Sequence, residues 1–385
     1  MENIDFQLRF KIRLLSLIAM LLVVYVHAYT FELDGYNGAL TAEKNFNIFI
    51  QDFISQGLAR VATPIFFILS GFLFFAGYKL QGTVVLHKYK SRVKSLLIPF
   101  ICWSSFGIGL YYALQLIPFT APFFSNRIIQ NLTPEELLYT LVVDPIPYQL
   151  WFLRDLIVLA LLSSALWLLI KYFKEGILLL MLVLWLAEAD IILCTTEALL
   201  FFSVGCYITI KPKLVKKLTS AYNYLPPLLG WLGLLIFKTE LIYLGIGPEI
   251  LLMLLHKLAI VAGIIAVWVT INTIAEKTGS LSRKWVFNSV SPFFIFAFHE
   301  PLLTMLKRGL LHLLHSNQGF TSFLVYLFAP VIAILVSIVL ARFLRQYLPA
   351  LFYILTGNRD KAADIFNPAL KHQPTPVIRK QILSS

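Results

Sequence analysis

Long apolar stretches dominate the chain, and short polar or charged segments separate them from one another. A helix that crosses a bilayer needs about 20 mostly apolar residues, and such runs recur about ten times here. Glu188, Asp190 and Glu197 interrupt one apolar region, so we divide it into two short candidates. We therefore predict an all-α fold, a polytopic integral-membrane helical bundle of about ten transmembrane helices. The predicted spans are residues 14–31, 53–77, 95–117, 149–170, 176–193, 198–210, 224–244, 250–275, 286–306 and 321–345.

The composition also indicates an integral-membrane protein. Of the 385 residues, 59% are hydrophobic and only 14% are charged, whereas soluble domains carry about 25% charged residues. The first apolar run follows a basic segment, but no small-x-small cleavage site follows the run, so we expect a retained span and not a signal peptide. The cysteines, Cys102, Cys194 and Cys206, form no C-x-x-C pair. They indicate neither a disulfide framework nor a zinc site, and we expect no metal.

The net charge of +12 has a topological explanation. With a cytoplasmic N-terminus and ten crossings, most Lys and Arg residues fall in cytoplasmic loops, while Asp and Glu gather in the opposite loops. This distribution satisfies the positive-inside rule, predicts that both termini are cytoplasmic, and explains the charge without a nucleic-acid partner. Residues 1–356 form the predicted membrane domain. Residues 357–385 are polar and contain three prolines, so we expect them to be a cytoplasmic tail.

Ionisable residues recur within the predicted spans, where charges are costly. At 1.5 Å per helical residue they lie about 6 to 10 Å below the outer surface. Each has a structural explanation: a histidine can bond a neighbouring helix, Arg154 can pair locally with Asp155, and Arg60 can pair with Glu300. Their shared depth favours a polar cavity, which suits either a transporter or an intramembrane enzyme. The residues in this layer are His27, Arg60, Arg154, Asp155, His299 and Glu300.

Local motifs separate these two classes. The first span ends in Val-Tyr-Val-His27, and the fourth opens with Gln149-Leu-Trp151-Phe152. The second carries Arg60-Val-Ala-Thr-Pro64-Ile-Phe66-Phe67-Ile-Leu-Ser70-Gly71-Phe72, a basic loop runs from Tyr89 to Pro99, and the ninth reads from Ser289 to His299-Glu300-Pro301. In this order and spacing, the motifs resemble the acyltransferase type 3 family from about residue 9 to about residue 345.

The resemblance implies an enzyme of the bacterial cytoplasmic (inner) membrane. Such a protein takes an acyl group, commonly acetyl, from cytoplasmic acyl-CoA (acetyl-CoA) and passes it to a hydroxyl or amine. The acceptor is commonly a carbohydrate or lipid-linked glycan at the outer side, so glycan and membrane lipid are the expected partners. By position, His27 matches the family's span-one histidine, Arg60 its second-span arginine, and His299 a histidine of the late span.

One position departs from the family pattern. The family usually places Arg or Lys eleven residues before the span-one histidine, and here that residue is Ser16. Arg13 lies about one turn earlier and can reach over several ångströms because long basic side chains snorkel. We therefore expect Arg13 to take this role, and Lys90, Arg92 and Lys94 to receive the phosphates of coenzyme A. The same charges also fit an ordinary cytoplasmic loop.

Acyl transfer assigns chemistry to the remaining residues. His27 is either the general base for the acceptor hydroxyl or the first acceptor of the acyl group. Arg60 presents a planar fork of donors that suits an oxyanion or the thioester carbonyl, and Glu300 or Asp155 can orient an imidazole. We expect Trp151, Arg154, Asp155 and Ser70 to line the cavity, with Ser70-Gly71 as a site of close helix packing and not a nucleophile.

Lys307 and Arg308 break the charge pattern, because they fall on the predicted outer side close to His312 and His315. One interpretation is a pair of cations at a span end that snorkel toward water. The other is a patch that holds an anionic lipid-linked acceptor.

Overall fold

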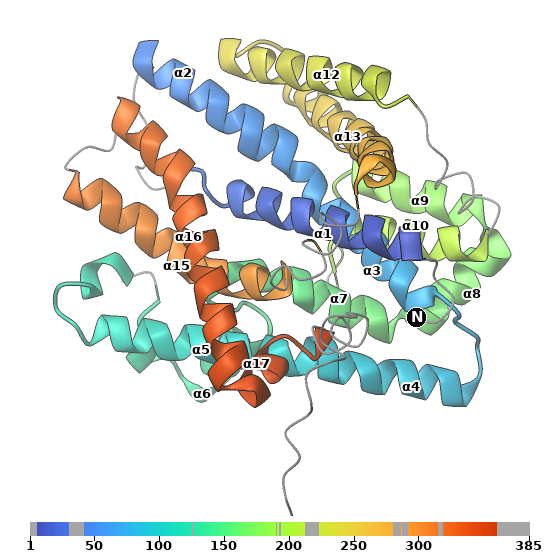
Figure 1. Cartoon of the computed structure of the whole chain (residues 1–385), viewed down its shortest axis with the longest axis horizontal. Coiled ribbons are helices and arrows are strands. Elements are labelled where there is room, and N and C mark those ends of the chain that lie inside the picture. Colours follow the sequence, from blue (N-terminus) through green and yellow to red (C-terminus); the bar gives the residue numbers. More distant parts are fainter. Residues whose placement is uncertain are drawn as a thin grey trace, which may run out of the picture.

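The computed structural model describes residues 6–30, 42–124, 127–189, 191, 194–211, 223–279, 286, 292–314 and 319–359. Throughout these residues the secondary structure is helical, with no β-strand (Figure 1). The helices of the first half are α1 (Phe6–Val26), α2 (Ala42–Gln51), η2 (Asp52–Gly57), η3 (Leu58–Val61), α3 (Ala62–Phe75), α4 (Gly82–Arg92), η4 (Val93–Leu97), α5 (Ile98–Gln115), η5 (Ala121–Phe124), η6 (Ile129–Asn131), α6 (Pro134–Val142) and η7 (Tyr148–Leu150).

The described residues of the second half also form helices, and the longest ones are α13 and α16. Its elements are α7 (Trp151–Leu161), α8 (Ser163–Phe173), α9 (Glu175–Leu186), α10 (Thr196–Ile210), α12 (Leu225–Leu244), α13 (Glu249–Lys277), α15 (Pro292–Leu313), α16 (Gly319–Tyr347) and α17 (Pro349–Leu355). Each of the ten predicted spans coincides with helix over most of its described residues. The all-α prediction is thereby confirmed.

The predicted number of spans is not confirmed. Among the described residues, five helical segments are long and apolar enough to cross a membrane: Phe46–Phe75, Gly82–Gln115, Leu225–Leu244, Glu249–Lys277 and Phe320–Tyr347. A sixth results if Tyr148–Leu161 and Ser163–Phe173, bent by 66°, count as one span. The sidedness of the termini stays a prediction.

The remaining predicted spans fall short for physical reasons. The helix α9 has 12 residues and α10 has 15, which at 1.5 Å per residue is less than the ~30 Å hydrocarbon thickness. In α1, every stretch of span length includes Arg9, Lys11 and Arg13. The helix α15 is broken at Glu300, whose backbone is not helical. Apolar composition alone therefore overestimates how many helices can cross independently.

The helix α1 runs through the centre of the molecule (Figure 1) and packs against α3, α13, α15 and α16. Its side chains Phe10, Leu15, Met20 and Val24 are almost completely buried. The central position explains how its basic residues are accommodated: Lys11 is buried by neighbouring helices and its Nζ lies 3.8 Å from Glu276 of α13. Both ends of α1 are thus held by the helices around it.

The helices α3 and α10 approach each other very closely. A Cβ atom built on Gly71 would lie 2.1 Å from the carbonyl oxygen of Phe202, and one on Gly205 would lie 2.2 Å from that of Ile68. Small residues that let helix backbones meet are a common packing device in membrane proteins. The close packing predicted at Gly71 is confirmed.

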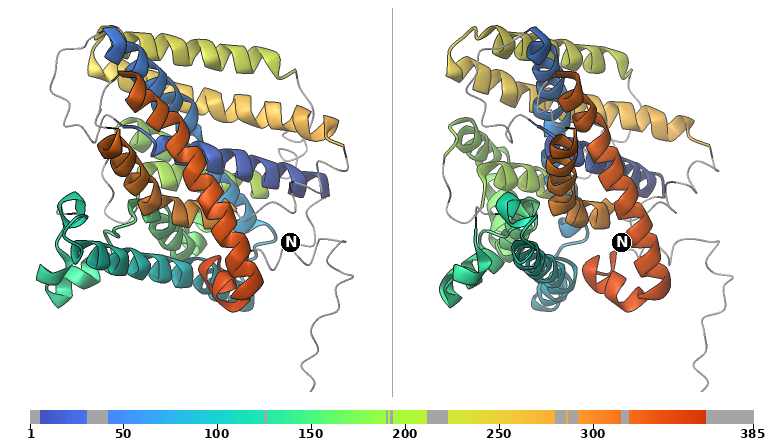
Figure 2. Two further views of the ribbon diagram at one scale, coloured as in Figure 1. Left: turned by 60° about the vertical axis from the view of Figure 1, so that its left-hand side comes forward. Right: turned by 90° about the vertical axis from the view of Figure 1, so that its left-hand side faces the viewer.

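Two flanks enclose this centre. The helices α12 and α13 lie side by side on one flank, and α4 and α5 run along the opposite flank (Figure 2). Near the end of the described chain, Gly357 lies against Ser95 and the Arg359 guanidinium lies 3.8 Å from the centre of the Phe293 ring. Packed structure therefore continues through residue 359, and residues 360–385 of the predicted tail lie outside the described residues.

Candidate functional site

Two predicted site residues, His27 and His299, meet near the centre of the molecule. His27 directly follows α1, and His299 lies in α15. Their rings are stacked, with centroids 5.4 Å apart and an angle of 26° between planes. His299 is fully buried, whereas His27 is partly exposed. Two imidazole rings from distant parts of the sequence therefore lie in contact.

The break in α15 fixes the tautomer of His299. A residue before proline avoids the helical region, and Glu300, which precedes Pro301, is extended (φ −108°, ψ 136°). The Nδ1 atom of His299 lies 2.7 Å from the carbonyl oxygen of Phe296 and 3.1 Å from that of Ile295. Because carbonyl oxygens only accept, Nδ1 carries the proton and the neutral ring has its lone pair on Nε2. That Nε2 is buried and lacks a hydrogen-bond partner in the described structure.

The segment η7 supplies hydrogen bonds to the backbone carbonyls at the break in α15. Pro301 has no N–H, so the Ala297 carbonyl loses its helical donor, and Gln149 Nε2 donates to it at 3.2 Å. The same amide nitrogen donates to the Glu300 carbonyl at 3.0 Å. Gln149 belongs to the motif that opens the fourth predicted span, but no role was predicted for it. Two features of the sequence pointed to this region: Gln149 stands just before Trp151, and α15 contains a proline. Neither feature reveals that Gln149 donates to the carbonyls of α15.

Tyr148 links His27 to Glu300. Its ring meets that of His27 edge to face, with centroids 4.9 Å apart, and its hydroxyl donates to Glu300 Oε1 over a long 3.3 Å. The other oxygen of this buried carboxyl accepts from the Thr304 N–H at 3.3 Å. Tyr148 was not predicted as a site residue, because a tyrosine in a loop carries no distinctive signal in the sequence.

Lys307 lies inside the site, contrary to both interpretations of it. Its side chain is 5% exposed, and Nζ donates to the carbonyl oxygens of His27 at 2.7 Å and Tyr29 at 3.0 Å. A cation suits carbonyls at the C-terminal end of a helix. Lys307 therefore neither snorkels toward water nor forms an external patch, because the end of α1 lies beside it. His315 lies outside the described residues.

Arg60 stands at the edge of this cluster. It lies on η3, and its Nε donates to Gln56 Oε1 at 2.8 Å, with a second bond from Nη2 to the same oxygen. Gln56 is thus a polar partner of Arg60, whereas the carboxyl of Glu300, the partner suggested by their shared depth, accepts from Tyr148 and Thr304. The element η3 packs against α1, the helix that ends directly before His27.

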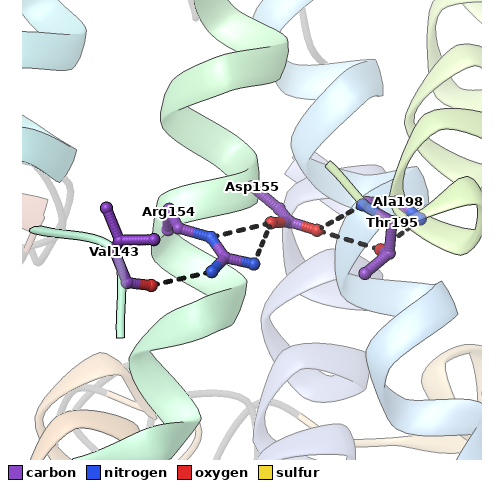
Figure 3. Close-up of polar contacts among 5 residues, drawn as sticks. All are labelled: Val143, Arg154, Asp155, Thr195 and Ala198. Carbon is purple, nitrogen blue, oxygen red and sulfur yellow. Dashed lines mark hydrogen bonds and ion pairs between the residues drawn. The ribbon is translucent and has the colours of Figure 1, made fainter. Parts of the chain in front are cut away.

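Arg154 and Asp155 form the local ion pair that was one of the predicted alternatives (Figure 3). Asp155 is fully buried and also accepts hydrogen bonds from the Thr195 N–H and hydroxyl, each at 2.9 Å. Arg154 Nη1 donates to the Val143 carbonyl at 2.8 Å. Since Thr195 caps the N-terminus of α10, the pair joins α7, α10 and the end of α6. The sequence offered Asp155 as one of two carboxylates to orient an imidazole, but its observed partners are Arg154 and Thr195.

A cavity of about 710 Å³ lies between Arg60 and Arg154. Within it, Lys257 of α13 lies 3.2 Å from Glu188, and its Nζ also donates to the Trp185 carbonyl. The predicted cavity residues Trp151 and Arg154 line it, as does Arg60, whereas Asp155 and Ser70 are not among its walls. Other lining residues are Thr63, Val142, Glu188, Thr195, Glu197 and Lys257.

The predicted donor-binding cations have different surroundings. Lys90 and Lys94 are exposed on α4 and η4, whereas the Arg92 guanidinium lies 5.0 Å from the centre of the Phe74 ring. Arg13 is partly buried on the central helix α1. Ser16, at the departing position, donates to the Ile12 carbonyl of its own helix at 2.7 Å. Ser16 therefore bonds within its own helix and does not supply the positive charge that the family usually has at this position.

Comparison with known proteins gives two findings. A family model described as an acyltransferase domain matches residues 10–342. The succinoglycan biosynthesis protein ExoH of Rhizobium meliloti (strain 1021) is 28% identical over 320 residues, which cover 80% of this chain and 82% of that protein. No solved structure gives a significant match.

Proposed function

Because this chain belongs to the acyltransferase family whose domain model spans residues 10–342, we propose that it transfers an acetyl group from cytoplasmic acetyl-CoA to a hydroxyl of a glycan at the outer face of the bacterial inner membrane. Its apolar helices and its family point to a multi-pass membrane protein. The printed name of the relative connects that protein with polysaccharide biosynthesis, which supports a carbohydrate acceptor here. An amine acceptor is the closest variant of this reaction.

The stacked pair of His27 and His299 is the observation that carries the proposal. General acid–base catalysis needs a group that takes a proton and returns it, and imidazole does both near neutral pH. The partly exposed ring of His27 meets the substrate, while His299 supports it from the buried side. Tyr148 and Lys307 hold the two sides of His27 through its ring and its carbonyl.

In the proposed reaction, a ring nitrogen of His27 takes the proton of the acceptor hydroxyl. The hydroxyl oxygen forms a bond to the thioester carbonyl carbon, and the carbonyl electrons move to oxygen. When the carbonyl re-forms, the carbon–sulfur bond breaks and coenzyme A leaves as a thiolate, which takes the proton from His27. In the alternative two-step route, a ring nitrogen of His27 bonds to the thioester carbonyl carbon as the carbon–sulfur bond breaks and coenzyme A leaves. The acceptor oxygen then bonds to that carbon as the carbon–nitrogen bond breaks, and the hydroxyl proton passes to the thiolate.

Arg60 is suited to the negative charge that develops on the carbonyl oxygen. Its guanidinium is permanently charged and directs several N–H donors in one plane, and preorganised donors of this kind often supply the largest part of catalysis. Gln56 holds the guanidinium through two hydrogen bonds. Arg60 can therefore stabilise an oxyanion without first reorganising.

On the donor side, we assign the coenzyme A phosphates to Arg13, Lys90, Arg92 and Lys94. The exposed Lys90 and Lys94 are free to move toward phosphate, and charge-assisted bonds to phosphate are strong. Arg92, which stacks on Phe74, has less freedom and contributes a fixed charge. Since these cations lie on the predicted cytoplasmic side, they suit a cytoplasmic donor.

The test uses the purified protein in lipid nanodiscs with acetyl-labelled acetyl-CoA and a panel of bacterial exopolysaccharide fragments that includes succinoglycan. We expect label to appear in a glycan product together with free coenzyme A, and His27→Ala to abolish both. A matched control, Ser16→Ala, removes a hydroxyl that bonds only within its helix and should behave like the wild type.

A transporter is the competing class. In sealed liposomes, a transporter moves a glycan or small solute whether or not acetyl-CoA is present. Solute movement that is indifferent to acetyl-CoA, combined with no labelled glycan, contradicts the proposed function.

A further inference from the structure

The cavity between Arg60 and Arg154 has the size and position of a binding site. Its volume of about 710 Å³ lies within the range of about 300–1,000 Å³ typical of ligand pockets. Its walls come from η3, α3, α6, α7, α10 and α13, and from α9 through Trp185. These residues lie at the helix ends that the charge pattern places on the outer side, which is where a glycan would arrive.

Charges on the cavity walls balance one another. Lys257 pairs with Glu188, and Arg154 pairs with Asp155 directly behind the wall. Among the described lining residues, the remaining charges are those of Arg60 and Glu197, one of each sign, and the ionisable side chain of His256 also lines the cavity. A strongly anionic ligand such as the phosphates of coenzyme A would need an excess of cations. The balance favours a ligand that is neutral and rich in hydroxyl groups.

The cavity also combines polar and aromatic surfaces. Thr63 supplies a hydroxyl group, and Trp151 is a partly exposed aromatic wall. A sugar ring presents hydroxyl groups at its edge and an apolar C–H face, so it needs hydrogen-bonding groups beside a flat apolar surface. Trp185 is almost fully buried under Lys257 and serves as support for the wall.

Arg60 connects this cavity to the histidine pair. It lines the cavity, and its element η3 packs against α1, which ends directly before His27. A hydroxyl held at the Arg60 edge would therefore lie toward the proposed base. We propose that the cavity binds the sugar residue of the acceptor glycan, and that Trp151, Thr63 and Glu197 determine which sugar is accepted; this inference rests on the proposed function.

Two variants fill the cavity from opposite sides. Val142 lines it from α6 and is 40% exposed, so Val142→Trp adds bulk at a position that tolerates it. Thr63→Trp adds bulk from α3. The matched control is Val183→Trp on α9, because Val183 is 52% exposed and is not part of the cavity wall.

Binding is measured without a donor, by titrating the fragments of the same exopolysaccharide panel onto each protein in nanodiscs. Acetyl transfer is measured separately. We expect Val142→Trp and Thr63→Trp to weaken binding of the best fragment at least about tenfold, a change of about 1.4 kcal/mol, and Val183→Trp to bind like the wild type. For transfer, the first two should raise KM for the glycan and leave KM for acetyl-CoA unchanged.

Several outcomes overturn the inference. One is wild-type binding by Val142→Trp and Thr63→Trp when both are folded, and another is a rise in KM for acetyl-CoA instead of the glycan. Absence of binding by the wild type across the panel also counts against the cavity. Tight glycan binding that is lost in the cavity variants, without acetyl transfer by the wild type, supports the cavity and contradicts the proposed function.

Discussion

The ring of His27, at the end of α1, stacks on that of His299 in α15 with centroids 5.4 Å apart. These residues come from opposite ends of the chain, and the fold places them in contact. Two imidazolium ions at this distance would repel each other, so a proton on one ring disfavours a second proton on the other. A proton taken from a substrate by His27 is therefore held beside a neutral His299 ring.

His299→Phe tests whether the second histidine takes part. Phenylalanine keeps an aromatic ring for the stack but removes Nε2, whose lone pair is the one ring site that the backbone carbonyls leave open. If that nitrogen shares in proton transfer, turnover should fall by about 10² or more. Turnover of the folded, membrane-inserted variant is the measurement. Wild-type turnover would show that His299 only packs.

Lys307→Met tests the connection between α15 and the end of α1. The change leaves the carbonyls of His27 and Tyr29 without their donor, and a buried polar group without a partner costs about 1–3 kcal/mol. We expect a lower melting temperature in detergent and lower turnover. Lys277→Met, at the exposed end of α13, is the control and should change neither. Equal melting temperatures for both variants would argue against a structural role for Lys307.

Gly71→Ala tests the contact between α3 and α10. Its new Cβ would lie 2.1 Å from the Phe202 carbonyl oxygen, so the helices must separate. Overpacking of this kind costs about 1–3 kcal/mol and occasionally more. Gly233→Ala on α12 meets no atom within 4 Å and should be neutral or slightly stabilising, since alanine favours helix over glycine. The measurement is the yield and melting temperature of each variant, and equal values would contradict the observed packing.

Helical regions of the fold could be predicted from the sequence, because a backbone in an apolar environment must satisfy its own hydrogen bonds. The number of independent membrane spans could not be predicted from the sequence. Whether the 12 residues of α9 or the charged first half of α1 lie in the membrane depends on the helices around them. Hydropathy along the chain does not contain that information.

The candidate site, like the fold, could be predicted only in part from the sequence. Motifs were enough to select His27, Arg60 and His299, but Gln149 and Lys307 could not be assigned. The sequence shows that Pro301 deprives a carbonyl of its donor, yet it does not show that Gln149 replaces that donor. Likewise, its position suggested that Lys307 reaches water, because only the fold places the end of α1 beside it.

Labelling of introduced cysteines tests the predicted topology. Thiol reagents that do not cross membranes should modify Glu135→Cys in intact cells, but should modify Lys90→Cys and a cysteine in the tail after residue 359 only once cells are opened. The expectation follows from the positive-inside rule. Both Glu135 and Lys90 are exposed in the structure, so each is accessible to the reagent. Labelling of the tail in intact cells would mean an odd number of crossings.

Arg60→Lys separates the charge of Arg60 from its geometry. Lysine keeps the positive charge but loses the planar fork, by which Nε and Nη2 both reach Gln56. If Arg60 stabilises the oxyanion, loss of aligned donors should lower kcat about 10²–10³-fold and change KM much less, since the ground-state carbonyl needs little of this stabilisation. If charge alone were enough, kcat would stay close to the wild-type value.

The matched control is Arg127→Lys. Arg127 pairs with Asp144 in a partly exposed loop, and an exposed ion pair contributes only about 0–1 kcal/mol, so this variant should keep both kcat and melting temperature. The decisive comparison is kcat of Arg60→Lys and Arg127→Lys at saturating acetyl-CoA and glycan. A kcat for Arg60→Lys within about threefold of the wild type, far above the loss expected for an oxyanion donor, would refute the assignment. Arg60 would then be left with the roles of binding Gln56 and lining the cavity.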